Sequence, residues 1–444
     1  MSFTLSIAQW WRFRLVTLFS LVGILALVAS ACGDDDDDVG TAAEKAGGDV
    51  PSTEDVGDAD ETSAERDDDE PTGGGPGIRI PEGEPIIIGL SLPLTGGAAA
   101  RGTNSRDGAL VGAELWKQEN GEQIAGRDIE FVVEDDGCSD AATAIVAAER
   151  LVDIPTLVGI LGPLCDGGTQ AVIPLYTESG IPMISGSASQ TDLTTTQPEA
   201  KFFFRTVFKN AAEGLVQATY AVETLGAETA YVIDDTEAYG EDLANTAQEE
   251  LEVAGVTVTR EQIAIGDTDF SALASRIADD NPDVVVFEGF NPEGQLLATA
   301  LDDAGYEGVF MSGDGVAEQG NFIDANPEVA EGAVFAGCAG FYTDDFTQRF
   351  NDLIGADPDT PFPQNYADAA YIMLTAINEV ATEDGGDVVI NTGELRDAIS
   401  GAQHDGFTGA IAFDENGDRV GETAEELGIV LCEVQGNAFV VIEQ

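Results

Sequence analysis

Apolar and polar positions alternate in a regular rhythm along most of the chain. From Pro85 onward, short β-branched and aliphatic runs are each followed by a longer stretch with apolar residues at helical spacing. Short apolar runs predict buried strands, and apolar residues three to four apart predict amphipathic helices. Repeated strand and helix units predict a parallel sheet with right-handed connections. The first units are strands at 86–90, 129–133, 157–161 and 182–185, with helices at 107–117, 141–151 and 169–177.

A second series of such units begins at Thr229. Two sheets of ordinary size account for all these strands better than one very large sheet. We therefore expect an α/β protein with two doubly wound, parallel-sheet lobes. The expected strands of the second series are 229–233, 256–261, 284–287 and 309–311, and its helices are 243–253, 270–278 and 295–301.

The C-terminal part follows another pattern. Helices are expected over 343–354 and 367–380, and strands over 410–413, 428–433 and 438–442. Asn416-Gly417 has the chemistry of a type I′ turn, so we expect the chain to end in an antiparallel hairpin.

The first 32 residues have the composition of a secretory signal. Arg12 and Arg14 precede an uncharged apolar run over 15–28, and small residues lead from there to Cys32. A membrane-spanning anchor is the alternative, but about 14 apolar residues are fewer than the roughly 20 that a spanning helix needs. A thiol directly after small residues resembles the bacterial lipobox, which implies that Cys32 is the site of lipid attachment.

Residues 33–84 are rich in Asp, Glu, Gly, Thr and Pro, and include consecutive aspartates from Asp34 to Asp38. Such a segment buries too little apolar surface to fold, so we expect a disordered acidic stalk. The whole chain has 83 acidic and 18 basic residues, which gives a net charge of −65. Nucleic-acid binding depends on basic residues that neutralise phosphates, so we exclude it as a function.

Four cysteines remain beside Cys32: Cys138, Cys165, Cys338 and Cys432. An even number in an exported chain indicates two disulfides, and four thiols allow three pairings. A zinc site is the alternative, but no two of these cysteines have metal-site spacing. We expect neither a bound metal nor a cofactor.

Signatures of enzymes are scarce. His404 is the single histidine, so a Ser-His-Asp or Cys-His site would have to use it, and no nucleophile-elbow pattern stands near it. The chain contains no phosphate-binding loop of the G-x-x-x-x-G-K-[ST] type and no histidine cluster. We therefore expect a protein that is not an enzyme, with His404 in a loop.

The loops that follow the predicted strands carry the more informative residues. Ligands of open parallel sheets bind beyond the carboxyl ends of the strands. Residues 162–168 join a strand to a helix, so backbone N–H groups there can bind an anion, although Asp166 could simply cap the helix. Residues 185–189 form a second small-residue loop, and Asp314 in 312–315 could take an ammonium or simply belong to an Asp-Gly turn.

The order of these motifs over about 80% of the chain resembles the type I periplasmic binding proteins of the branched-chain amino-acid (Leu/Ile/Val) transporter family. Each stretch is weak alone, and their collinear order makes the resemblance strong. The matching stretches are 93–96, 133–138, 162–165, 181–185, 204–206, 234–240, 266–271, 289–293, 311–315 and 413–418.

This resemblance implies two lobes joined by three crossovers, near Arg205, Phe341 and Ala410. The N-terminal lobe would comprise 85–205 and 341–410, and the C-terminal lobe 206–340 and 411–444. Closure about the crossovers would bury the ligand. The resemblance also implies that Cys138 pairs with Cys165, which leaves Cys338 and Cys432 as the second pair.

The ligand-binding positions of the family fall on a defined set of residues in this sequence. The carboxylate-binding positions fall on Asp166, Ala188 and Ser189, and the ammonium-binding acid falls on Asp314. Aromatic walls fall on Tyr239, Phe290 and Tyr366, although core packing is the alternative for the two tyrosines.

Three residues depart from the family pattern. Asp166 stands where serine is common, and it would repel a ligand carboxylate unless its side chain turned inward to cap the helix. Asp314 is one methylene shorter than the usual glutamate, so the ligand must sit closer or a water must intervene. Arg101 stands where an aromatic residue is frequent, near the rim of the pocket, and could offset Asp166.

The resemblance, the signal and the stalk together imply the ligand-binding component of an ABC importer. We expect it to capture a small polar ligand, an amino acid with the branched-chain type favoured, and to deliver it to a membrane permease. We expect a monomer held by its lipid at the outer face of the cytoplasmic membrane, in a periplasm or at the cell surface. The alternatives are a ligand-sensing receptor domain, or a carrier of an amide, urea or an aromatic acid.

Overall fold

The computed structural model describes residues 77–195, 202–338 and 342–442. The expected signal peptide, the lipid attachment at Cys32 and most of the expected stalk lie outside the described residues. Within the described ranges, none of the helices combines the length and the apolar composition needed to cross a bilayer.

The N-terminal lobe is built on a six-stranded sheet with the spatial order β3-β4-β2-β5-β6-β7. All neighbouring strands are parallel except the short pair β3 and β4. The strands are β2 (Ile86–Leu92), β3 (Gln123–Ile124), β4 (Arg127–Asp135), β5 (Leu157–Leu161), β6 (Met183–Ser185) and β7 (Phe203–Arg205).

Both faces of this sheet are covered by helices, so its central strand is apolar at nearly every position. All seven residues of β2 are buried. Ile86, Ile88 and Leu90 belong to the core on one face, while Ile87 belongs to the core on the other, as the two-residue period of a strand requires. The helices of this lobe are α2 (Ala99–Asn120), α3 (Ala141–Val152), α4 (Asp166–Ser179), α10 (Asp344–Ile354), α11 (Pro363–Val380) and α12 (Thr392–Ser400).

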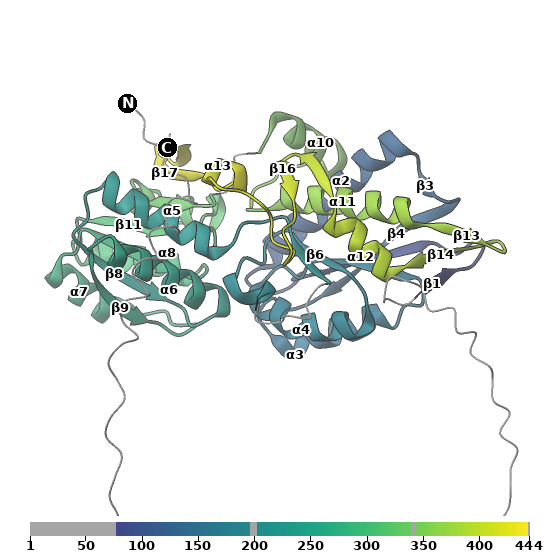
Figure 1. Ribbon diagram of the computed structural model, residues 1–444. Helices are drawn as coiled ribbons and strands as arrows, with labels where there is room; N and C mark the ends of the chain where they lie inside the picture. Colours follow the sequence, from purple (N-terminus) through teal and green to yellow (C-terminus); the bar gives the residue numbers. More distant parts are fainter. Residues whose placement is uncertain (1–76, 196–201, 339–341, 443–444) are drawn as a thin grey trace, which may run out of the picture. The chain divides into compact units, whose positions relative to one another are not determined.

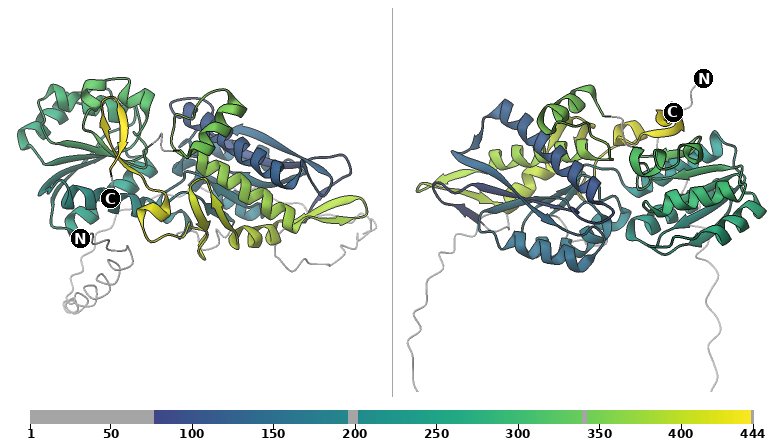
Figure 2. Two further views of the ribbon diagram at one scale, coloured as in Figure 1. Left: turned by 90° about the horizontal axis from the view of Figure 1, so that it is seen from above. Right: turned by 180° about the vertical axis from the view of Figure 1, so that it is seen from behind.

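Helices α2 and α11 lie along each other on one face of the sheet, as the purple-blue and light-green helices show in the left view of Figure 2. Two glycines of α2 allow this close approach. A Cβ atom on Gly108 would lie 2.0 Å from the Pro363 carbonyl oxygen, and one on Gly112 would lie 2.0 Å from that of Ala367. Since α11 is fixed against α2 by backbone contact, the start of α2 is held in place beside the strand-end loops.

The folded part begins earlier than the sequence predicted. Residues 77–84 were assigned to the stalk, but β1 (Gly77–Ile80) pairs antiparallel with β14 (Asp387–Asn391), which also pairs with β13 (Thr382–Asp384). Ile80 is completely buried in the core of the N-terminal lobe, and its burial is the physical reason for the correction.

The C-terminal lobe contains a seven-stranded sheet with the order β18-β17-β12-β11-β10-β8-β9. Strands β8 to β12 run parallel to one another. Strand β17 pairs antiparallel with β12, and β18 pairs antiparallel with β17 at the edge of the sheet. The prediction of an α/β fold with two parallel-sheet lobes is confirmed. The strands are β8 (Thr229–Asp234), β9 (Thr257–Gln262), β10 (Val284–Glu288), β11 (Val309–Ser312), β12 (Val334–Ala336), β17 (Leu431–Gln435) and β18 (Ala438–Val441).

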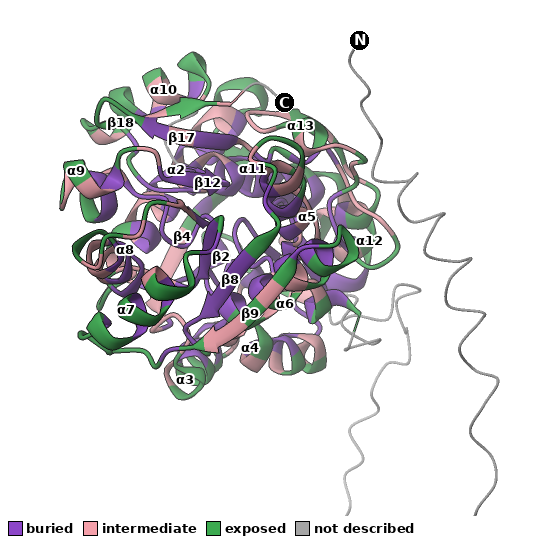
Figure 3. Ribbon diagram, turned by 90° about the vertical axis from the view of Figure 1, so that its left-hand side faces the viewer, coloured by how far each residue is buried: buried purple, intermediate pink, exposed green. Residues whose placement is uncertain are grey.

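The core of this lobe is centred on β10, whose five residues are all buried. Strand β9 lies at an edge and alternates between exposed and half-buried residues, which appear green and pink in Figure 3. The helical segments are α5 (Asn210–Glu223), α6 (Ala238–Val253), α7 (Ser271–Asp280), α8 (Glu293–Asp303), η3 (Gln319–Ile323), α9 (Pro327–Ala330) and α13 (Ala424–Leu427).

The chain passes between the two sheets at three places. The first lies between β7 and α5, close to Arg205 as expected. The second lies between β12 and α10, and Phe341 itself falls outside the described residues.

The third crossover comes later than Ala410. Strands β15 (Gln403–Gly406) and β16 (Gly409–Ala412) form a hairpin beside α11, and the Gly417 carbonyl still accepts a hydrogen bond from the Arg205 N–H at 3.0 Å. The chain reaches the C-terminal lobe at α13, as the yellow segment in Figure 1 shows. An ion pair keeps the chain on the N-terminal lobe as far as Asp418, because the carboxylate of Asp418 lies 2.7 Å from the guanidinium of Arg205.

The expected terminal hairpin exists, but its turn is different. Strands β17 and β18 are joined by Gly436 and Asn437, both with positive φ. Asn416-Gly417 instead closes a short turn across the isolated bridge between Phe413 and Arg419.

Two disulfides join the four described cysteines. Cys138 pairs with Cys165 across 27 residues of sequence, and Cys338 pairs with Cys432 across 94. The first bond ties the loop after β4 to the loop after β5, and the second ties the end of β12 to its antiparallel neighbour β17.

Candidate ligand-binding site

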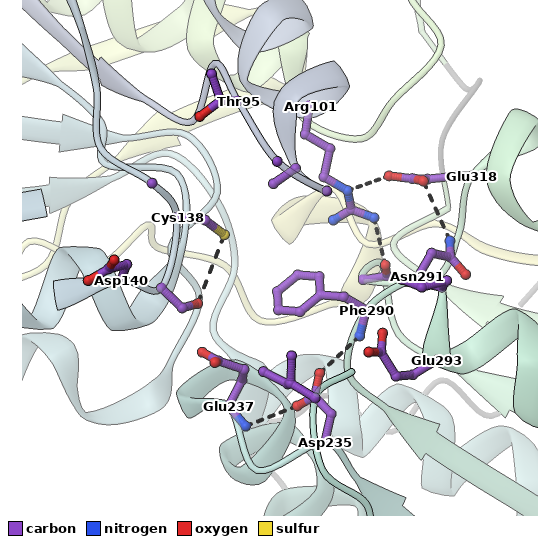
Figure 4. Close-up of a pocket in the computed structure, with 18 residues that line it drawn as sticks. Thr95, Arg101, Cys138, Asp140, Asp235, Glu237, Phe290, Asn291, Glu293 and Glu318 are labelled. Carbon is purple, nitrogen blue, oxygen red and sulfur yellow. Dashed lines mark hydrogen bonds and ion pairs between the residues drawn. The ribbon is translucent and has the colours of Figure 1, made fainter. Parts of the chain in front are cut away.

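Loops from the carboxyl ends of strands in both sheets surround a cavity of about 450 Å³. Parallel strands deliver their following loops to one edge of a sheet, and this edge is where such folds bind ligands. Loops 95–98 and 137–140 come from the N-terminal lobe, and 235–237, 290–293 and 315–318 contribute from the C-terminal lobe. Figure 4 shows the two sets of loops facing each other across the cavity.

Asp314 lies behind the cavity lining, directly before the lining residue Gly315, and is only 3% exposed. The Tyr239 hydroxyl donates a hydrogen bond of 3.0 Å to Asp314 Oδ1, and the Gly315 N–H donates one of 3.1 Å to the same hydroxyl. Burial raises the pKa of Asp314 to about 6, although the charge of Arg101 opposes this shift. The side chain is therefore a buried acid that gains from a nearby cation.

Two further acids stand behind Asp314, and the sequence reasoning missed both. Glu213 on α5 and Glu288 at the end of β10 are fully buried. Glu213 accepts a 3.1 Å hydrogen bond from the Asp314 N–H, and Glu288 accepts one of 2.9 Å from the Gly313 N–H. Burial, followed for Glu213 by the charge of Asp314, raises the pKa of both carboxyls. The sequence did contain a sign that Glu288 belongs to the site, because a charged residue directly follows the apolar run 284–287. No comparable sign marks Glu213.

Arg101 is the cation that faces this acidic wall. It comes from the first turns of α2 and is 5% exposed. Its Nε lies 2.5 Å from Glu318 Oε1, and its Nη2 donates to the carbonyl oxygens of Asp314 at 2.9 Å and Gly315 at 2.7 Å. Burial alone would lower the pKa of Arg101, but the charges of Glu318 and Asp314 outweigh it and raise the pKa.

The expectation that Arg101 offsets Asp166 is therefore wrong. Its guanidinium is directed to Glu318 and Asp314, and the charge that lowers the pKa of Asp166 comes from Arg205. Glu318 was also missed, because the sequence around it gives no sign of a partner more than 200 residues away.

Phe290 lines the cavity beside Arg101. Its ring centroid lies 5.1 Å from that of Tyr239 and 5.7 Å from the Arg101 guanidinium carbon. The Phe290 N–H donates to Asp235 Oδ2 at 3.1 Å, which fixes the loop that carries the ring. Phe290 and Tyr239 thus form a packed aromatic pair that connects the cavity lining to Asp314.

Asp166 begins α4 and is 2% exposed. One alternative was that Asp166 caps its own helix. The structure shows no such capping bond. Its Oδ1 accepts a 3.0 Å hydrogen bond from the Gln190 N–H, so it ties α4 to the loop after β6. Burial raises the pKa of Asp166 to about 7, and the charges of Asp242 and Asp314 add to this shift.

Ala188 and Tyr366 have partners within the N-terminal lobe, whereas Ser189 is bonded to Asn210 at the start of α5 in the C-terminal lobe. The Ala188 N–H donates to Ser185 Oγ at 3.0 Å, and the Ser189 carbonyl accepts from the Asn210 N–H at 2.8 Å. Tyr366 is fully buried in the core, and its hydroxyl lies 3.2 Å from both Ser187 Oγ and the Pro163 carbonyl oxygen. Of the expected residues, Arg101 and Phe290 line the described cavity. Tyr239 contacts Phe290, and Asp314 contacts Arg101. The remaining four expected residues are not part of the lining: Asp166, Ala188, Ser189 and Tyr366.

Two α/β lobes joined by three crossovers, with facing strand-end loops around a buried acid, define a ligand-binding protein of the two-lobed type. Residues 85–425 match the family model of the periplasmic binding protein, and the chain belongs to this family.

Curated relatives point to one branch of the family. The chain is 27% identical to the Leu/Ile/Val-binding protein BraC3 of Rhizobium johnstonii. The 336 aligned residues cover 75% of this chain and 88% of that protein. It is 29% identical to the leucine-, isoleucine-, valine-, threonine- and alanine-binding protein of Pseudomonas aeruginosa, over 75% of this chain and 87% of that one. The predicted resemblance to the binding proteins of branched-chain amino-acid transporters is confirmed.

Solved structures share the fold. A leucine binding protein LivK of Thermotoga maritima matches with a TM-score of 0.70 and 24% identity, over 81% of this chain and 98% of that one. A solute binding protein of an ABC transporter from R. palustris, in complex with benzoate, matches with a TM-score of 0.67 and 21% identity, over 81% and 95% of the two chains.

Proposed function

We propose that this protein is the substrate-binding component of an ABC importer and captures an amino acid between its two lobes. The observation that carries the proposal is the buried carboxylate of Asp314, which lies behind the lining residues Arg101 and Gly315 in an acidic cluster with Glu213 and Glu288. Such a cluster stabilises an ammonium group, because a buried acid gains most from an opposite charge close by. The relatives are named for branched-chain amino acids and, in one case, also for threonine and alanine, so an amino acid is the ligand class to test first.

The carboxylate of the ligand would bind on the N-terminal lobe. The first turn of α4 and the loop that contains Ala188 and Ser189 follow neighbouring strands β5 and β6. The N–H groups at the start of a helix favour an anion. Asp166 fits this role when its carboxyl is protonated, and its pKa of about 7 supports that state.

Transport requires partners at the membrane. We infer that the lipid on Cys32 holds the protein at the outer face of the cytoplasmic membrane, and that it delivers its ligand as a monomer to the permease. The family consists of solute-binding proteins, which supports a role in transport without catalysis.

Calorimetric titration of the purified protein with a panel of amino acids tests the proposal. We expect binding of at least one amino acid, and we expect Asp314→Asn to weaken it by at least about 2 kcal/mol, roughly 30-fold in Kd. Asp303→Asn, at an exposed position near the end of α8, is the matched control and leaves the affinity unchanged. Equal affinity of the Asp314→Asn variant and the wild type contradicts the role of Asp314, and binding of no amino acid refutes the proposed ligand class.

A further inference from the structure

The hydrogen bonds of Arg101 leave one end of its guanidinium directed at the cavity. Nε and Nη2 are fixed by Glu318 and by two backbone carbonyl oxygens. Nη1 lies 3.8 Å from Asp314 Oδ2, which is beyond hydrogen-bond distance. Within the described residues Nη1 makes no other polar contact, although the side chain is 6% exposed and lines the cavity. A ligand in the cavity would cover Nη1, and a donor that is covered without an acceptor is costly, so this geometry calls for an acceptor on the ligand.

The start of α2 adds further donors to the same part of the cavity. Gly97 and Ala98 line it directly, and Ala98, the residue that caps this 22-residue helix, makes no side-chain capping bond. The first N–H groups of a helix have no partner within the helix. The Ala99 N–H already donates to the Gly96 carbonyl oxygen at 3.4 Å, so the N–H groups that follow it in the first turn are the donors that remain on this element beside Arg101.

The charges around the cavity decide what kind of acceptor fits. Among the lining residues that the structure describes, Arg101 is the only base, and its charge is already neutralised by Glu318 at 2.5 Å. A second carboxylate, on the side chain of the ligand, would lie among the five acids that line the cavity: Asp140, Asp235, Glu237, Glu293 and Glu318. A cationic ammonium group has no acceptor, so it could not take the hydrogen bond that Arg101 Nη1 offers.

We propose that Arg101 is a specificity-determining residue whose Nη1 donates a hydrogen bond to an uncharged acceptor on the side chain of the ligand, such as a carboxamide. This inference rests on the proposed function, since Asp314 must hold the ammonium of the same ligand. Arg101 Nη1 lies 3.8 Å from Asp314 Oδ2, so the two groups would bind neighbouring parts of the ligand. Phe290 packs beside Arg101 and Tyr239, and the cavity of about 450 Å³ that it lines leaves room for a side chain with a polar end. A branched aliphatic side chain would leave the donors without an acceptor.

The test compares four ligands on three proteins. Glutamine, leucine, glutamate and lysine are titrated into the wild type, Arg101→Met and Arg106→Met. Arg106 lies on the same helix, is partly exposed and pairs with Asp107, so it is the matched control. We expect the wild type to bind glutamine at least about tenfold more tightly than leucine, because a site built to hydrogen-bond a ligand group discriminates against analogues that lack it.

In Arg101→Met the preference for glutamine is expected to disappear or reverse, while Arg106→Met keeps it. An unchanged ratio of glutamine to leucine affinity in Arg101→Met overturns the inference. So does tighter binding of leucine, glutamate or lysine than of glutamine by the wild type.

A second variant keeps the test informative if Arg101→Met does not fold. Glu318→Gln retains the guanidinium but removes its neutralising partner, so glutamate affinity should rise relative to glutamine by about tenfold or more. No change in that ratio contradicts the charge argument. If the wild type binds none of the amino acids, the proposed function fails, whereas preferred binding of leucine refutes only the role of Arg101.

Discussion

Arg101 and Glu318 form an ion pair of 2.5 Å although 217 residues separate them in the sequence. Arg101 stands at the start of α2 in the N-terminal lobe, and Glu318 directly precedes η3 in the C-terminal lobe. Both side chains are buried, so the pair is screened little by solvent and removing one partner leaves a buried charge. The contact therefore links the two lobes at the edge of the candidate site.

Loss of this link should loosen the ligand-free protein. In Glu318→Ala the guanidinium of Arg101 loses its closest partner, and the lobes should separate more readily. We expect small-angle scattering to give a larger radius of gyration for the ligand-free variant than for the wild type. Saturating ligand should remove the difference, and identical ligand-free radii would show that the pair does not hold the lobes together.

The stability of the ligand-free protein should increase as the pH falls from about 8 to 5. Burial raises the pKa of Asp136, Asp166 and Asp235 to about 7, and that of Asp314 to about 6. Between the unfolded value near 4 and these folded values the native state binds more protons, so the free energy of unfolding declines as the pH rises.

Urea unfolding at several pH values measures this dependence. Each such group adds at most one proton, or about 1.4 kcal/mol per pH unit, to the slope. Asp166→Asn should flatten the slope between about pH 4 and 7, because it removes one of these groups. A slope that Asp166→Asn leaves unaltered would contradict the raised pKa of Asp166.

Ligand affinity should change with pH in the opposite direction. An ammonium group is held by the charged form of Asp314, whose pKa is about 6. The affinity for an amino acid should therefore fall as the pH is lowered below about 6, under conditions that stabilise the ligand-free fold. Titrations of the Asp166→Asn variant at pH 5 and 7.5 check this without the opposing effect of Asp166, whose ionisation above about pH 7 would repel the ligand carboxylate. Tighter binding at pH 5 in this variant would argue against a charged Asp314 as the ligand's partner.

The disulfide between Cys138 and Cys165 should contribute strongly to stability. It closes a loop across 27 residues between two strand-end loops. In the chain-entropy model a loop of this size is worth about 3–4 kcal/mol. The double variant Cys138→Ser/Cys165→Ser should lose about this much free energy of unfolding in urea titrations, and a loss below about 1 kcal/mol would be inconsistent with this role.

The contact between α2 and α11 should not tolerate a single added methyl group. A Cβ at residue 112 would lie 2.0 Å from the Ala367 carbonyl oxygen, so Gly112→Ala must push the helices apart. We expect a loss of about 1–3 kcal/mol or more in the free energy of unfolding. Gly320→Ala is the control, because a Cβ there meets nothing within 4 Å, and equal effects of the two substitutions would contradict the packing argument.

Features with a local signal could be predicted from the sequence. The alternating units gave the order of strands and helices, because buried strands such as β2 are apolar on both faces. The strand-end loops also had a local signal, and Arg101, Phe290 and Asp314 were found through their place in the family pattern.

Features that depend on distant partners could not be predicted. Strand β1 exists because Ile80 reaches the core and pairs with β14, more than 300 residues later. The third crossover was misplaced because Asp418 is held by Arg205, a contact without a local signature. The partners of Arg101, and the burial of Glu213 behind Asp314, likewise depend on the meeting of elements remote in sequence.

The central claim is that Asp314 holds the ammonium group of an amino-acid ligand. A crystal structure of the protein with its tightest-binding amino acid tests this most directly. The account predicts the ligand nitrogen within about 3.2 Å of an Asp314 carboxylate oxygen, with the ligand carboxylate towards the start of α4. A ligand whose nitrogen lies away from Asp314, or whose density lies outside the space between the strand-end loops, would contradict it.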